Sequence, residues 1–145
     1  MLWLRLSTSA VLMSSFLSTL VLDERLRRRR FYSAFLIFAA ILVMGSIPGA
    51  RAEIGQFGSG IFLHSVAYGT LAFLLYTGTT GERNRRAVRA VLAVALMGAI
   101  DEIVQSFLPY RRGSPVDWLI DCCAASVTAG VLWRFMPQPI HSSHP

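Results

Sequence analysis

The sequence predicts an all-α integral membrane protein, folded as a bundle of four transmembrane helices. Apolar residues make up 54% of the 145-residue chain and charged residues only 15%. Several apolar runs approach the roughly 20 residues that a helix needs to cross a bilayer. The basic residues, all of them arginine, lie in clusters beside these runs, as they do in membrane proteins.

The same observations limit the number of domains and the kinds of partner. A chain of this length is enough for one domain. Its formal net charge of +6 is concentrated beside apolar runs, so it does not indicate a basic surface for nucleic acid. We expect membrane lipids as partners and no nucleic acid.

Residues 1–30 form an N-terminal segment that is apolar first and basic afterwards. This order is the reverse of a signal peptide, because the arginines of 25–30 follow the apolar part. We favour an amphipathic helix lying on the membrane surface, with a fifth span as the alternative. We expect the arginine run to set orientation and to contact lipid headgroups. The apolar face of this helix would consist of Met13, Phe16, Leu17 and Leu20.

The transmembrane domain is predicted to cover residues 31–137. At 1.5 Å per residue its four spans are about 26 to 33 Å long, which matches the hydrocarbon core. Residues 138–145 are expected to be a disordered C-terminal tail. The predicted spans are 31–47, 60–77, 87–108 and 116–136.

Arginine placement predicts the orientation of the bundle. Basic loops stay in the cytoplasm, so both termini should be cytoplasmic and the loops 48–59 and 109–115 should face outward. The outward side carries only Arg51, Arg111 and Arg112. The arginines assigned to the cytoplasmic side are Arg25, Arg27, Arg28, Arg29, Arg30, Arg83, Arg85, Arg86, Arg89 and Arg134.

Ionisable residues of three spans are predicted to meet at one level, in the outer part of the bilayer. Glu102 lies about six residues, roughly 9 Å, below the outer end of the third span. His64 lies at a similar depth in the second span, and Asp117 and Asp121 lie in the first turns of the fourth. A charge at the bilayer centre costs about 3 kcal/mol, so such groups are usually paired, wetted or functional.

These positions give a set of candidate site residues. We expect His64, Glu102, Asp101 and Asp117 to supply acid–base chemistry or to bind a metal, although no standard metal motif is present. Asp101 points about 100° away from Glu102 and should contact another helix or a loop. The candidate ligand-binding residues are Tyr68, Gln105, Arg111, Ser114 and Asp121.

Structural interpretations of several candidates stay open. Ser114 and Asp117 belong to Ser-Pro-Val-Asp, a helix-start pattern in which Asp117 could be only a capping residue. Gln105 could simply join helices, and Tyr68 could simply pack. Arg111 should fold over the cavity mouth and meet either a carboxylate or an anionic ligand. The adjacent Cys122 and Cys123 indicate packing, neither a disulfide nor a metal site.

Residues 101–117, DEIVQSFLPYRRGSPVD, together with HSVAY beginning at His64, resemble the signature of the VanZ-like membrane proteins. The resemblance covers about residues 60–130. It implies a small multi-helix membrane domain in the bacterial cytoplasmic membrane, in a family named after a factor for low-level glycopeptide resistance. The chain departs from the family where Gly-Ile-Phe-Leu precedes His64 in place of Asp-Lys, and where Tyr110 replaces Gly. It also has Asp121 where Asn is common.

The leading interpretation is a cell-envelope membrane protein with an outward-facing polar site for a lipid-linked or anionic envelope precursor, or one that contributes to glycopeptide-type resistance. Arg111 would hold the anion, while Glu102 and His64 would act as acid and base. The alternatives are a small proton- or ion-coupled carrier and a structural membrane assembly factor. The sequence does not separate an enzyme from a binding protein, and it does not identify a cofactor.

Overall fold

The computed structural model describes residues 23–49 and 59–136, and this part of the chain is all-helical. The predicted all-α class is therefore confirmed for these residues. The predicted surface helix within residues 1–22 and the predicted tail at 138–145 lie outside the described residues. The four helices are α2 (Glu24–Gly45), α4 (Gly60–Gly78), α5 (Arg83–Ser106) and α6 (Pro115–Phe135).

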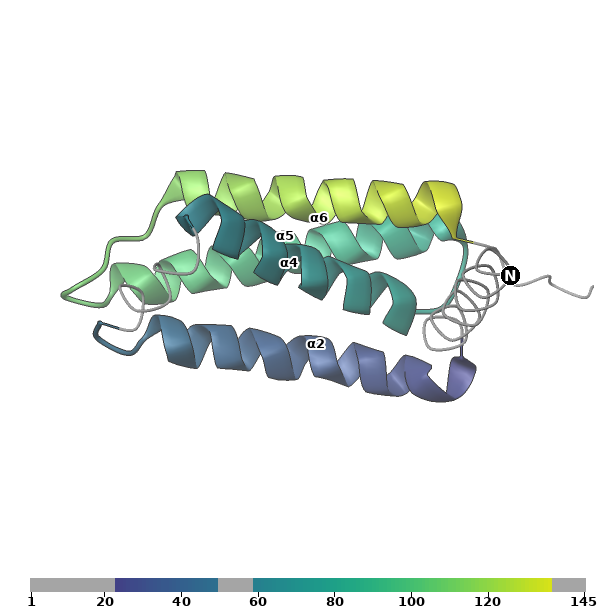
Figure 1. Cartoon of the computed structure of the whole chain (residues 1–145), viewed down its shortest axis with the longest axis horizontal. Coiled ribbons are helices and arrows are strands. Elements are labelled where there is room, and N and C mark those ends of the chain that lie inside the picture. The colour runs from purple at the N-terminus through teal and green to yellow at the C-terminus, as the bar shows by residue number, and fades with distance from the viewer. Residues whose placement is uncertain (1–22, 50–58, 137–145) are drawn as a thin grey trace, which may run out of the picture.

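The helices lie side by side along the long axis of the molecule (Figure 1). Helix α4 packs against each of the other three, and α6 also packs against α5. In Figure 1, α2 and α6 lie on opposite sides of α4. The turn that joins α5 to α6 lies at the same end of the bundle as the last turn of α2 and the first turn of α4. This end, called the polar end below, carries most of the candidate site residues.

Helix boundaries follow from capping. Ser114 accepts a hydrogen bond from the Asp117 amide at 3.2 Å and Pro115 is the first helical residue, which confirms the predicted start of α6. Helices α2 and α5 begin at Glu24 and Arg83, several residues before the apolar spans that are predicted to start at 31 and 87. Arginine is a good helix former, so both helices continue through their basic segments.

Length and hydropathy divide the helices into two pairs. Helices α4 and α6 are long and apolar enough to cross a membrane. The first turns of α2 and α5 are rich in arginine, so the apolar part of each is shorter than the helix. The described structure thus shows two candidate spans where the sequence analysis predicted four.

The core fills the bundle below the polar end. From α4 it takes Tyr68, Leu71 and Leu75, all at most 3% exposed. Small residues on the neighbouring helices allow close packing, as the sequence predicts for membrane helices. Across from α4 the core contains Ala34, Ala90, Val94, Met97, Ala125 and Ala129.

Two arginines cap the other end of α4. Arg30 donates to the carbonyl of Thr77 at 3.1 Å, and Arg86 donates through Nε to the carbonyl of Tyr76 at 3.0 Å. The guanidinium of Arg86 also lies 4.5 Å from the centre of the Tyr76 ring. The last carbonyls of a helix lack intrahelical partners, so these contacts stabilise the end of α4 in addition to marking its orientation.

Candidate functional site

The first turns of α4 and α6 bring His64 beside two aspartates. His64 Nδ1 lies 2.9 Å from Asp121 Oδ1, and His64 Nε2 lies 3.9 Å from Asp117 Oδ2. Asp121 is fully buried, whereas His64 and Asp117 keep slight exposure. The structure therefore places all three predicted residues in one cluster.

The adjacent acids of α5 point to different neighbours, as the 100° step along a helix predicts. Asp101 is 2% exposed and accepts a hydrogen bond from the Tyr68 hydroxyl at 2.9 Å. Glu102 points toward α6, where its Oε2 accepts from the amide of Ser114. Asp101 thus joins α5 to α4, while Glu102 joins α5 to the start of α6.

The close approach of α5 and α6 depends on two glycines. A Cβ at Gly98 would lie 3.0 Å from Asp121 Oδ2 and 3.2 Å from Trp118 Cδ1. A Cβ at Gly113 would lie 2.5 Å from the backbone oxygen of Glu102, a distance that real Cβ atoms do not show. The glycines therefore let the carboxylates of the two helices face each other across a short gap.

Arg111 joins the turn to α2, a contact that the sequence analysis missed. Its Nη1 donates to the carbonyl of Gly45 at 2.9 Å, and its Nη2 donates to Gln105 Oε1 at 2.8 Å. The expected partner was a carboxylate or an anion, and the structure instead gives a carbonyl and an amide. Tyr110 makes a second link to α2 by donating its hydroxyl to the carbonyl of Ser46.

A cavity of about 230 Å³ lies beside this cluster. Its walls come from α2, α4, α5 and the turn before α6, and they combine apolar and polar side chains. His64 is shared between the cavity and the aspartate cluster, and its ring stacks on Tyr68 with 5.8 Å between ring centres. The residues that line the cavity include Ile41, Met44, Leu63, Tyr68, Gln105 and Arg111.

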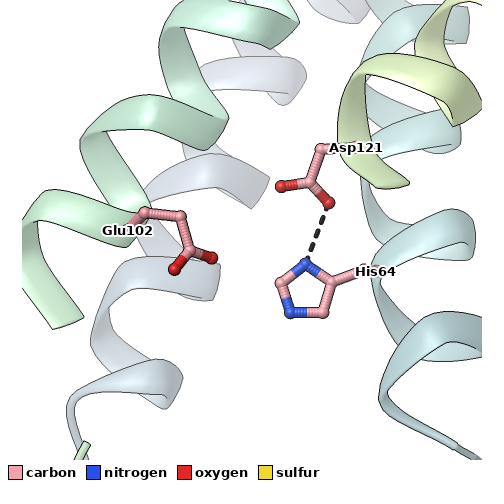
Figure 2. Close-up of side chains that lie close together, drawn as sticks. All are labelled: His64, Glu102 and Asp121. Atoms are coloured by element: carbon pink, nitrogen blue, oxygen red, sulfur yellow. Dashed lines mark hydrogen bonds and ion pairs between the residues drawn. The ribbon is translucent and has the colours of Figure 1, made fainter. Parts of the chain in front are cut away.

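Among the residues that the structure describes, three buried polar atoms at this end have no hydrogen-bond partner: Glu102 Oε1, Asp121 Oδ2 and Arg111 Nε. Donor atoms of His64, Glu102 and Asp121 also lie within 4.8 Å of one another. Figure 2 shows these three side chains converging on one space. The arrangement offers acceptors for a cation on the α5–α6 side and a donor for an anion on the cavity side.

The Tyr68–Asp101 hydrogen bond gives a stability prediction. Tyr68→Phe removes the donor to a buried carboxylate, so we expect the free energy of unfolding in detergent to fall by about 1–3 kcal/mol. Tyr76→Phe is the matched control, because Tyr76 is equally buried on the same helix and its hydroxyl has no hydrogen bond in the described part of the chain. Equal losses in the two variants would show that the Asp101 contact contributes nothing to stability.

Comparisons of the chain with protein-family models, curated proteins and solved structures found no match. The interpretation of the site therefore depends on its geometry.

Proposed function

We propose that the chain is a multi-pass protein of the bacterial cytoplasmic membrane, of the VanZ-like kind, whose polar end faces outward and binds an amphiphile with an anionic head. A lipid-linked envelope precursor is the substrate class that fits. The observation that carries the proposal is the cavity beside Arg111, because its wall is apolar on one part and hydrogen-bonding on another.

The surface of the helices supports the membrane part of the proposal. Large apolar side chains are exposed on all four helices, among them Leu36 at 72%, Leu92 at 64% and Val127 at 67%. Soluble monomers rarely expose apolar surface so widely. Lipid would cover these side chains, and α2 and α5 would then be spans as well, with their arginine-rich turns in the headgroup region.

The charge distribution supports the outward orientation. The arginines of α2, of the start of α5 and of the end of α6 lie at one end of the bundle, while Arg111 and Arg112 lie at the polar end. Because basic segments stay on the cytoplasmic side, the polar end would face the outside and the described termini would face the cytoplasm.

The cavity suits a molecule that has an apolar tail and an anionic head. Ile41, Met44 and Leu63 provide an apolar wall, and Gln105 and Arg111 provide donors. The buried Nε of Arg111 has no hydrogen-bond partner in the described part of the chain, and a phosphate or carboxylate oxygen would satisfy it. Binding sites of this kind are mostly apolar with a few polar groups that fix orientation.

The cluster beside the cavity supports an acid–base role in the same proposal. A histidine held by a carboxylate is the usual arrangement of a general base, and Asp121 holds His64 at 2.9 Å. Glu102 would serve as its acidic partner. A role of the protein in glycopeptide-type resistance has no such geometric support, and only the resemblance to the VanZ-like proteins implies it.

The carrier and assembly alternatives make different demands on the structure. A carrier needs polar groups through the whole bundle, yet the interior between the cluster and the arginine-rich end is filled by Leu71, Leu75, Val94 and other apolar residues. This packing disfavours the carrier. An assembly factor would need the cluster only for helix packing, and a binding measurement separates it from the proposal.

The binding test compares two lipids of equal chain length. We expect the purified protein in detergent to bind a polyprenyl phosphate at least tenfold more tightly than the corresponding polyprenol, as measured by native mass spectrometry. Inorganic phosphate should bind weakly, because it lacks the tail that fills the apolar wall. Equal affinity for the phosphate and the alcohol would contradict an anion-binding site.

A further inference from the structure

We propose that His64, Glu102 and Asp121 bind a divalent metal cation. The three side chains come from α4, α5 and α6, and their donor atoms lie within 4.8 Å of one another. Figure 2 shows the imidazole and the two carboxyl groups directed into a common space. The inference goes beyond the proposed function and does not depend on the anion-binding cavity, and a bound metal would take the His64 lone pair and so replace the general-base role described above.

The first support is a pair of unpartnered carboxylate oxygens. Asp121 is fully buried and uses Oδ1 to contact His64, while its Oδ2 has no partner among the described residues. Glu102 uses Oε2 to accept from the Ser114 amide, while its buried Oε1 likewise has no partner in the described ranges. Burying an anionic oxygen without a partner is costly, and a bound cation removes that cost.

The second support is that no described arginine neutralises the two unpartnered carboxylates. Four acids, Asp101, Glu102, Asp117 and Asp121, lie at the polar end together with Arg111 and Arg112. In the part of the chain that the structure describes, no arginine forms an ion pair with Glu102 or Asp121, because Arg111 is directed to a carbonyl and an amide. His64 can supply one positive charge at most. A divalent cation would balance both unpartnered carboxylates.

The donor set narrows the choice of metal. Calcium and magnesium prefer oxygen ligands alone, whereas imidazole nitrogen favours zinc and its first-row neighbours. With its proton on Nε2, His64 would direct the lone pair of Nδ1, which lies 2.9 Å from Asp121 Oδ1, toward the metal. Three protein ligands also leave a fourth zinc position open, as catalytic zinc sites do. We therefore assign the site to Zn²⁺ and expect Mn²⁺ to bind more weakly.

The geometry requires only a small adjustment. Zinc holds its ligands at about 2.0–2.2 Å, so tetrahedral donors lie about 3.4 Å apart. Donors that already lie within 4.8 Å reach this spacing by rotation of the carboxyl groups. The glycine at position 98 leaves the space beside Asp121 Oδ2 free of a side chain.

The test measures zinc uptake without any amphiphile, so it is independent of the binding test above. The protein is purified with a histidine-free tag, stripped with a chelator, dialysed against Zn²⁺ and analysed for metal per chain. Cys122→Ala, Cys123→Ala, His141→Gln and His144→Gln form the background, because these residues could bind zinc adventitiously. We expect one zinc per chain and an increase in the thermal unfolding midpoint on zinc addition.

Three variants make the test specific. Glu102→Gln and Asp121→Asn keep shape but remove charge, and each should weaken zinc binding at least tenfold. Glu102→Gln should retain or gain stability in the metal-free state, because a buried charge is removed. Asp121→Asn should lose stability, because Asp121 is the buried partner of His64. Glu82→Gln changes an exposed carboxylate at the opposite end and should bind zinc as the parent does. The proposal would be overturned if the parent took up no zinc, or if zinc uptake were unchanged in Glu102→Gln and Asp121→Asn.

Discussion

Alanine at Gly78 is expected to destabilise the bundle by about 1–3 kcal/mol, because the added methyl group would overpack a contact between two backbones. A Cβ at this position would lie 2.7 Å from the Phe31 nitrogen and 2.8 Å from the Phe31 Cα. Backbone atoms cannot turn aside as a flexible side chain does, so α2 must move away from α4. That movement would also lengthen the hydrogen bond from Arg30 to Thr77.

Gly130 provides the control for this variant. It also lies within a helix, and a Cβ there would meet nothing within 4 Å. Alanine is the better helix former by up to about 1 kcal/mol, so Gly130→Ala should be neutral or stabilising. Unfolding in detergent measures both variants, and equal stabilities would show that α2 and α4 do not meet as described.

Lysine at Arg111 is expected to weaken binding of a polyprenyl phosphate at least tenfold. The guanidinium donates to Gly45 of α2 and to Gln105 of α5 and keeps Nε for a ligand. A lysine ammonium is a single point charge and cannot hold two helices and an anion in one planar arrangement. The same native mass spectrometry measurement that compares phosphate with alcohol gives the affinity.

Arg112→Lys is the matched control, because Arg112 is exposed and should contact only solvent or headgroups. It should bind the phosphate as the parent does. Thermal unfolding of both variants separates a binding defect from loss of the bridge between α2 and α5. If Arg111→Lys retains full affinity, the anionic ligand loses its main support. If Arg112→Lys is the defective variant, the turn directs that residue to the cavity instead.

Residues whose roles follow from local chemistry could be predicted from the sequence. Ser114 and Pro115 start α6 because a capping side chain and a proline favour a helix start wherever the chain lies. The separation of Asp101 from Glu102 follows from the 100° step of the helix. The meeting of His64 with Asp121 follows from equal depths in adjacent spans.

Contacts that depend on how helices and turns are placed could not be predicted. Arg111 reaches Gly45 because the turn folds toward α2, and no periodicity in the sequence encodes that direction. Helix α2 therefore contributes to the cavity without any polar side chain that could have marked it. Helices α2 and α5 begin before the predicted spans because clustered arginines, which mark the edge of a span, are also good helix formers.

Topology labelling in intact spheroplasts tests most directly the central claim, that the polar end faces outward from a membrane bundle. Single cysteines at Arg112 and at Glu82, in a chain with Cys122→Ala and Cys123→Ala, report on the two ends, and both positions are exposed. Gly113 is unsuitable, because a side chain there would strike the Glu102 backbone. When an impermeant maleimide is added outside, we expect Arg112→Cys to be labelled at once and Glu82→Cys to be labelled only after lysis. Labelling of Glu82→Cys from outside, with Arg112→Cys protected until lysis, would contradict it.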